Sequence, residues 1–212
     1  MAEGNHRHLK KSEITRKKII DEAYELFLRL GFSETTIAMI SKAVGVSYGS
    51  VYTYFNSKAD IFIEIMDDTV KPLYIMARTP FFPTSAKNAY EIIWKQSLSY
   101  LSLSVTHKRI LEIIDEAIYL SPDVRLKWQH IRDYFLGTIT QDIQYSQNVG
   151  LLRKGVIPEI AAREWNSTNE FFLWEVLKKP RLYVLEDLAK IISREYVISI
   201  YDIKNYDELT MS

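Results

Sequence analysis

Apolar residues recur every three or four positions along most of this chain, and few residues interrupt the pattern. Ile19, Ala23, Phe27 and Leu30 share one face of a helix that we expect to begin at Ser12. The 212 residues include 7 Gly and 6 Pro, which is few for this length. Because Leu, Ile, Glu and Lys favour helices whereas Gly and Pro interrupt them, the sequence predicts an all-α fold.

Caps and breaks divide this pattern into about nine helices. We predict them at residues 12–30, 37–44, 48–55, 57–78, 86–105, 108–120, 122–147, 158–179 and 185–201, after a loose arm at residues 1–11. The helices are short before about residue 65, and they are long and rich in aromatic residues after it. We therefore predict a small N-terminal domain over residues 1–58 and a larger helical domain over residues 59–212.

The composition excludes several classes of site. There is no cysteine, so disulfides, zinc–thiolate sites and cysteine nucleophiles are excluded. The formal net charge is +0, so only a local basic patch could attract nucleic acid. No apolar run approaches the roughly 20 residues of a membrane span, and the N-terminus lacks the apolar segment of a signal peptide. We expect a cytoplasmic protein without a membrane partner.

Two short predicted helices, at residues 37–44 and 48–55, are joined by Gly45, Val46 and Ser47. This arrangement indicates a helix-turn-helix, whose second helix enters the major groove of DNA. Gly45 permits the backbone angles of the turn, and Ser47 is the expected cap of the second helix.

The second helix carries more hydroxyl groups than a buried helix needs. Val51 and Phe55, four residues apart, form its expected buried stripe. The hydroxyl side chains spread over the remaining surface are Tyr48, Ser50, Tyr52, Thr53 and Tyr54. Such groups can donate hydrogen bonds to phosphates and base edges. A core helix with tyrosines at its rim fits the same spacing, so spacing alone leaves both interpretations open.

Basic residues flank this motif on both sides. Lys58 is expected in the first turn of a helix, where a cation opposes the helix dipole, so a phosphate partner explains it better than helix stability does. Cations that could neutralise phosphate without distinguishing sequences are Lys10, Lys11, Arg16, Lys17 and Lys18. A run of this kind is also typical of a solvated helix face.

A set of residues around the motif matches a known pattern. Its members are Gly31, Phe32, Thr35, Thr36, Ile40, Ala43, Gly45, Val46, Ser47, Gly49, Val51, Tyr52, Tyr54, Phe55, Ser57, Lys58, Ile61 and Phe62. With this set, the first third of the chain resembles the tetracycline-repressor (TetR) family of bacterial transcription regulators. The remainder is similar only in its plan of long helices.

The resemblance implies roles for individual residues. It implies phosphate contacts from Thr36, Ser47, Tyr52 and Lys58. It implies groove contacts from Tyr48, Gly49, Ser50, Thr53 and Tyr54. Two residues depart from the family pattern, since Ser41 stands where Ala is usual and Tyr48 where Lys or Arg is common. Losing that cation should make the dependence of DNA affinity on salt shallower by about one unit of slope.

The resemblance also implies an effector pocket within the later helices and a dimer built mostly from the last two. The predicted helices 158–179 and 185–201 carry more apolar surface than one side of a helix normally shows. Such breadth favours contact with a partner as well as with the protein's own core. We therefore expect a homodimer.

Aromatic residues with a few polar groups are typical of small-molecule sites. The candidates in the larger domain are Trp94, Ser97, Tyr119, Trp128, Phe135, Asn169 and Phe172, although each alone fits an ordinary core position. Glu112, Asp115 and Glu116 lie among apolar neighbours, and Glu116 joins the candidates. A buried acid would suit a cationic or hydrogen-bond-donating ligand, whereas an acidic face paired with Lys108 or Arg109 is the alternative.

No catalytic arrangement is visible in the sequence. The histidines are His6, His8, His107 and His130, and their spacing fits no metal motif. There is no P-loop and no glycine-rich dinucleotide turn. We expect no enzyme activity, no cofactor and no metal.

These patterns together predict a homodimeric DNA-binding regulator. The simplest form is a repressor that binds an inverted-repeat operator and is released by a small-molecule effector. Two alternatives remain open at this point. One is an adaptor of the same fold that binds DNA without a ligand switch, and the other is a purely structural helical protein.

Overall fold

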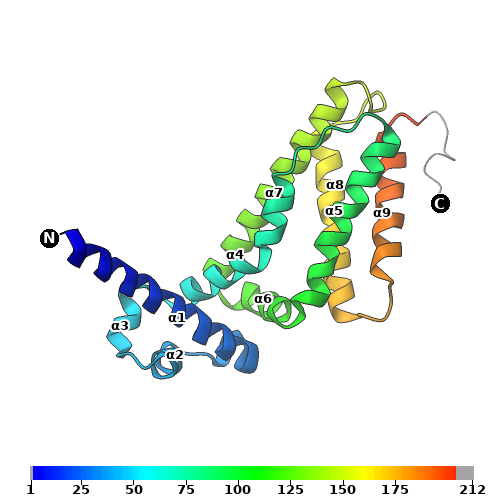
Figure 1. Cartoon of the computed structure of the whole chain (residues 1–212). Helices are drawn as coiled ribbons and strands as arrows, with labels where there is room; N and C mark the ends of the chain where they lie inside the picture. The colour runs from blue at the N-terminus through cyan, green and yellow to red at the C-terminus, as the bar shows by residue number, and fades with distance from the viewer. Residues whose placement is uncertain (1, 204–212) are drawn as a thin grey trace. The chain divides into compact units, whose positions relative to one another are not determined.

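The computed structural model describes residues 2–203, with side chains from residue 12 onward, and this part of the chain is helical (Figure 1). Its helices are α1 (Ala2–Glu34), α2 (Ile37–Val44), α3 (Tyr48–Tyr52), α4 (Lys58–Ala77), α5 (Ala86–Thr106), α6 (Lys108–Leu120), α7 (Pro122–Asn148), α8 (Pro158–Lys178) and α9 (Leu185–Ile200). One isolated antiparallel bridge joins Leu152 to Tyr201. The predicted all-α fold of about nine helices is confirmed.

The helix boundaries differ from the prediction mainly at the N-terminus. Helix α1 begins at Ala2, so the loose arm expected at residues 1–11 is wrong for residues 2–11. Polar residues hid this helix because they leave no apolar stripe. The side chains of Lys10 and Lys11 lie outside the described residues. Helix α3 ends at Tyr52, although the Phe55 N–H still donates to the Val51 carbonyl at 3.1 Å.

The contacts divide the chain into two compact units. One comprises Met1–Lys71 with Arg109–Gln129, and the other comprises Pro72–Lys108 with His130–Ser212. Helices α4 and α7 therefore contribute to both units. The boundary expected at residue 58 stays a prediction. Helix α6 and the start of α7 lie in the unit that contains the helix-turn-helix.

The first unit has an aromatic centre. Phe27, Phe32 and Phe62 come from α1 and α4, and their ring centroids lie 4.9–5.9 Å apart. Ile40 of α2 and Val51 of α3 are fully buried in the same unit. Edge-on and stacked rings add to the free energy of burying apolar surface. This core holds the two short helices, which are too short to be stable alone.

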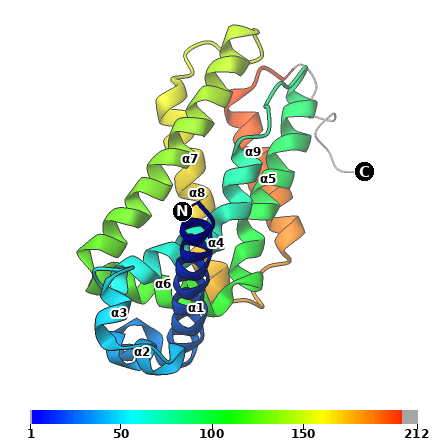
Figure 2. The same ribbon diagram turned by 60° about the vertical axis from the view of Figure 1, so that its left-hand side comes forward.

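The second unit is a helical bundle in which α5 packs along α8 and α9, as Figures 1 and 2 show. The rings of Trp165 on α8 and Tyr196 on α9 stack at 4.5 Å. The Tyr201 and Ser146 hydroxyls are hydrogen-bonded at 3.0 Å and fasten the end of α9 to α7. None of the described helices has both the length and the apolar character needed to cross a bilayer.

Candidate functional site

The turn between α2 and α3 is built by backbone groups of the turn itself. Gly45 has φ 76° and ψ 34°, in the left-handed region that favours glycine. The N–H groups of Gly45 and Val46 both donate to the Ser41 carbonyl at 3.1 Å. The predicted role of Gly45 in the turn is confirmed. Ser41 is buried, and its hydroxyl donates to the Ala38 carbonyl at 3.0 Å.

Hydroxyl side chains begin both helices of the motif. Thr36 accepts a hydrogen bond from the Met39 N–H at 3.2 Å, and Ser47 accepts one from the Ser50 N–H at 3.2 Å. The hydroxyls of Ser47 and Ser50 are also 2.7 Å apart. These caps confirm the predicted starts of α2 and α3. The Thr36 and Ser47 hydroxyls are thereby held at the exposed N-terminal ends of α2 and α3.

Two tyrosines form a pair on the outer face of α3. The rings of Tyr48 and Tyr52 meet edge-on with centroids 5.1 Å apart, and their hydroxyl oxygens are 3.1 Å apart. The hydrogen bond with Tyr48 raises the pKa of Tyr52. The side chains are 53% and 43% exposed, so the pair is not part of the core. Each tyrosine holds the other in a defined position on the surface.

The remaining predicted contact residues, in α3 and directly after it, also face solvent in whole or in part. Gly49 is exposed, and a Cβ built there meets no atom within 4 Å. The exposed Thr53 hydroxyl donates to the Ser50 carbonyl at 2.7 Å, and Tyr54 is half-buried. Val51 and Phe55 are the buried residues, as predicted. The protein's own packing therefore does not require glycine at position 49.

Lys58 has a structural role that the sequence did not reveal. Its ammonium donates to the carbonyls of Phe32, Ser33 and Thr35 at 2.7, 2.9 and 2.9 Å. Burial lowers the pKa of Lys58, and the carboxylates of Glu116 and Glu34 oppose that shift. Three carbonyl acceptors account for all three donors of the ammonium. A phosphate is therefore not needed to explain a lysine in the first turn of α4.

Glu116, a predicted ligand-binding residue, lies at the end of α1. Its carboxylate accepts a hydrogen bond from the Ser33 N–H at 3.3 Å. A Cβ on Gly31, whose φ is 81°, would lie 3.2 Å from the same carboxylate. Arg109 at the start of α6 donates to the Leu28 carbonyl at 3.0 Å. These contacts place Glu116 in the unit that holds the helix-turn-helix and not in the cavity of the other unit.

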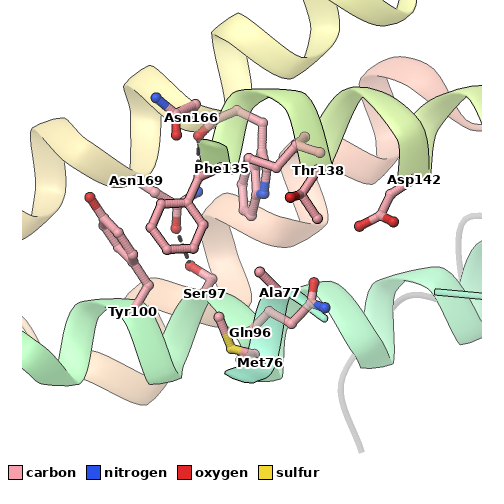
Figure 3. A pocket seen from close by; sticks show the side chains of 12 residues that line it. Met76, Ala77, Gln96, Ser97, Tyr100, Phe135, Thr138, Asp142, Asn166 and Asn169 are labelled. Atoms are coloured by element: carbon pink, nitrogen blue, oxygen red, sulfur yellow. Dashed lines mark hydrogen bonds between the residues drawn. The ribbon is translucent and has the colours of Figure 1, made fainter. Parts of the chain in front are cut away.

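The second unit contains an internal cavity of about 70 Å³ (Figure 3). Its walls come from α4, α5, α7 and α8, and the lining residues are Met76, Ala77, Gln96, Ser97, Tyr100, Phe135, Thr138, Ile139, Asp142, Trp165, Asn166 and Asn169. Ser97 donates to the Asn169 side-chain oxygen at 2.7 Å, and Asn169 donates to the Trp165 carbonyl at 3.0 Å. The cavity thus combines aromatic walls with a few oriented polar groups.

The predicted ligand-binding residues are divided between this cavity and other places. Ser97, Phe135 and Asn169 line it. Trp94 lies on α5 with the Lys190 ammonium 5.3 Å from its ring centroid, and Phe172 lies on α8 against Tyr183. Tyr119 is 78% exposed on α6, and Trp128 is buried at the start of α7 in the first unit. A role in ligand binding stays a prediction for all of them.

Asp142 is the one acidic residue among the cavity residues that the sequence did not predict. It follows Phe135 and Thr138 along α7, and burial raises its pKa to about 7. Its neighbours Ile139 and Ile143 were the available signal, since an acid between apolar residues at helical spacing has one side toward the core. No group of His, Asp or Glu side chains in the described residues is arranged to hold a metal ion.

Residues 19–65, which form the core of the helix-turn-helix unit, match the family model described as bacterial regulatory proteins, tetR family. These residues therefore form a domain of the tetR family. This is a family of regulators, in agreement with the prediction that the chain is not an enzyme. The regulator AcrR of Shigella flexneri is 43% identical over 53 residues, which are 25% of each chain. The match thus spans about a quarter of that relative.

Two solved structures share the whole tetR-family fold. NalD, the secondary repressor of the MexAB-OprM multidrug efflux pump in Pseudomonas aeruginosa, superposes with a TM-score of 0.69 at 23% identity, over 90% of this chain and 98% of NalD. SmeT, the repressor of the Stenotrophomonas maltophilia multidrug efflux pump SmeDEF, superposes with a TM-score of 0.71 at 21% identity, over 92% and 93%. SmeT has also been solved in complex with triclosan. At these identities the likeness concerns the fold.

Proposed function

We propose that this protein is a homodimeric transcriptional repressor that binds an inverted-repeat operator and leaves it when a small molecule occupies the cavity. The observation that carries the DNA-binding part is the surface of α3. It presents a tyrosine pair and an exposed glycine that the protein's own packing does not use. A glycine with open space around it suits close approach of another molecule, and paired phenols suit contact with bases and phosphates.

Within this proposal the residues of the motif divide into two groups. Thr36, Ser47 and Tyr52 contact phosphates from the exposed ends of α2 and α3. The residues that enter the major groove are Tyr48, Gly49, Ser50, Thr53 and Tyr54. Lys58 contributes indirectly, because it fastens the end of α1 beside the motif. Arg16 also pairs with Glu64 at 2.7 Å within the protein.

A homodimer is supported by apolar side chains left exposed around α8 and α9. Phe171 on α8, Val184 before α9 and Ile191 on α9 are 60%, 66% and 49% exposed. Large apolar groups that face water on neighbouring helices favour association with a matching surface. Sedimentation should show a dimer at micromolar concentration, and a monomer would contradict this part of the proposal.

Ligand release is supported by the cavity and by the likeness to NalD and SmeT. Both are repressors of multidrug efflux pumps by their descriptions, and SmeT binds triclosan in its solved complex. A ligand that binds better to a conformation unsuited to the operator lowers DNA affinity by the same factor by which DNA lowers ligand affinity. The cytoplasm is the expected location, since the operator is there.

Selection of random duplexes with the purified protein tests the DNA-binding part. We expect enrichment of an inverted repeat whose half-sites lie about one helical turn apart. Footprinting on the promoter beside the gene is the second measurement. Failure to enrich any sequence would refute a sequence-specific regulator. Enrichment with an affinity that no small lipophile changes would favour the constitutive adaptor.

A further inference from the structure

Asp142 stands where three cavities of the second unit adjoin. It lines the 70 Å³ cavity and a smaller one of about 30 Å³, and these two share Gln96, Ile139, Asp142 and Trp165. It also lines an open cleft of about 630 Å³ beside the segment 78–82, and Thr138 lines both the cleft and the larger inner cavity. Asp142 is therefore accessible from the cleft as well as from the inner cavities.

The Asp142 carboxylate has no protein partner in the described part of the chain. No hydrogen bond or ion pair to it is present, and burial alone raises its pKa to about 7. The other titratable groups that line the inner cavities are Tyr100, Tyr196 and Tyr201. Those that line only the open cleft are Arg78, Asp133, Tyr134 and Tyr145. A half-buried acid without a counter-charge is costly, and it persists where function requires it.

A second polar group in the same place also lacks a partner. The Tyr196 hydroxyl is buried and makes no hydrogen bond, and the residue lines the 30 Å³ cavity together with Asp142. Its ring stacks on Trp165, which fixes where the hydroxyl points. Buried hydroxyls are normally hydrogen-bonded, so this unsatisfied one, in a cavity that a half-buried carboxylate also lines, indicates a missing hydrogen-bond partner.

The walls around these two groups suit a cation. Neither inner cavity is lined by Lys or Arg among the described residues, so the carboxylate is the charge that a ligand meets. Tyr100, Phe135 and Trp165 present aromatic rings, and the faces of such rings attract cations. An anionic ligand would face Asp142 without compensation, and a neutral hydrocarbon would leave both polar groups unsatisfied.

We propose that the effector is an amphipathic organic amine, whose protonated nitrogen pairs with Asp142 and donates to Tyr196 while its apolar body occupies the aromatic cavity. This inference rests on the proposed function only in treating the cavity as the effector site. The small inner volumes suit a compact apolar group, and the open cleft leaves room for longer substituents.

Calorimetry with a matched pair of probes tests the inference. The probes are 4-phenylbutylamine and 4-phenylbutan-1-ol, measured at pH 8 so that Asp142 is mostly ionised. We expect the amine to bind about tenfold or more tightly than the alcohol, as one charge-assisted hydrogen bond would give. In Asp142→Asn the two probes should bind within about twofold of each other, and in Tyr196→Phe the preference for the amine should decrease about threefold.

The control is Asp133→Asn. Asp133 lies on the same helix as Asp142, and it lines the cleft but neither inner cavity. It should keep the full preference for the amine. Thermal unfolding of each variant shows whether it is folded, and Asp142→Asn is expected to be at least as stable as the parent. Equal affinity for both probes, an unchanged preference in Asp142→Asn, or no binding of the amine at millimolar concentration would each overturn the inference.

A parallel measurement of operator binding separates this inference from the proposed function. If the amine binds through Asp142 but operator affinity does not change, the ligand switch fails and the amine site stands. If the amine does not bind but a neutral lipophile such as 1-decanol releases the operator, the switch stands and the amine site fails.

Discussion

Helix α3 and the cavity around Asp142 both display polar groups that have no evident role in the fold, but these groups differ in their exposure to solvent. On α3, Tyr48 and Tyr52 are exposed, so solvent satisfies whatever their mutual hydrogen bond leaves open. In the cavity, the Tyr196 hydroxyl is buried without a hydrogen bond, and Asp142 is half-buried without a protein partner. The first arrangement costs little folding free energy, whereas the second lowers stability until a ligand supplies a partner.

The contrast distinguishes two kinds of binding surface. A surface that meets a large polar partner such as DNA can be left in water, because the partner also arrives hydrated. A surface that meets a small apolar molecule is mostly apolar, with few polar groups placed where the ligand can satisfy them. Substitutions in α3 should therefore change binding and leave stability alone, whereas substitutions at Asp142 should change both.

The largest effect is expected for Tyr48→Ala. Loss of a tyrosine that contacts bases should weaken specific DNA binding by about 1–3 kcal/mol. The free energy of unfolding should change by no more than about 0.5 kcal/mol, because the side chain is exposed. The control is Tyr119→Ala, which removes a tyrosine that is 78% exposed on α6. Equal DNA affinity of the two variants would break the proposed role of Tyr48.

Lys58→Met should lower the free energy of unfolding by about 2 kcal/mol, since three carbonyls at the end of α1 lose a charged donor that is itself partly solvated. Lys42→Met, at an exposed position of α2, is the control. Chemical denaturation measures both variants. If the Lys58→Met variant is as stable as the parent and loses only DNA affinity, Lys58 contacts phosphate as the sequence predicted.

Asp142→Asn should stabilise the ligand-free protein by about 1–2 kcal/mol at pH 8 and by less at pH 5. The folded-state pKa of about 7 lies above the ordinary 3.8, so the folded protein holds this proton between those values while the unfolded chain releases it. In the parent, the free energy of unfolding therefore decreases as the pH rises from about 4 to about 7. The variant lacks this carboxyl group and does not show this decrease. Urea denaturation at the two pH values checks this, and a destabilised variant at pH 8 would show that the carboxylate has a partner.

A glycine pair sharpens the contrast within the motif. Gly45→Ala should lower the free energy of unfolding by about 1 kcal/mol, because its φ of 76° strains any residue with a Cβ. Gly49→Ala should leave stability within about 0.5 kcal/mol and weaken operator binding, because its Cβ has space in the free protein. If Gly49→Ala binds the operator normally, α3 does not approach DNA at that position.

The smallest effect concerns salt. Tyr48→Lys restores the cation that is common at this position in the resembling family. The slope of log affinity against log salt should become steeper by about one unit, corresponding to one additional phosphate neutralised. Titrations at several salt concentrations measure it. An unchanged slope would place residue 48 away from the phosphates.

Much of the first unit could be predicted because its determinants are local. The left-handed turn at Gly45 and the cap at Ser47 depend on residues only a few positions apart, and so do the limits of α2 and α6. Helix α1 was predicted to start too late, since its first ten residues carry no apolar stripe and periodicity is the only criterion that sequence offers there.

The candidate sites were predicted unequally for the same reason. The residues of α3 share one short helix, so a single motif identified them together. The cavity is assembled from four helices, and only Ser97, Phe135 and Asn169 among the predicted ligand residues line it. Glu116 was selected for its apolar neighbours along α6, but its carboxylate accepts from a backbone N–H 83 residues away.

The sequence by itself determined most helix limits, the turn and the hydroxyl-rich surface of α3, because hydrogen bonds over three or four residues and the period of a helix decide them. The tertiary structure alone decided that Lys58 closes α1, 26 residues away in sequence from Phe32, and that Ser97 meets Asn169 across 72 residues. It also decided that Asp142 and Tyr196 line one cavity. Whether an acid ends on the exposed surface or half-buried in a cavity depends on which helices surround it, and helical periodicity carries no information about that choice.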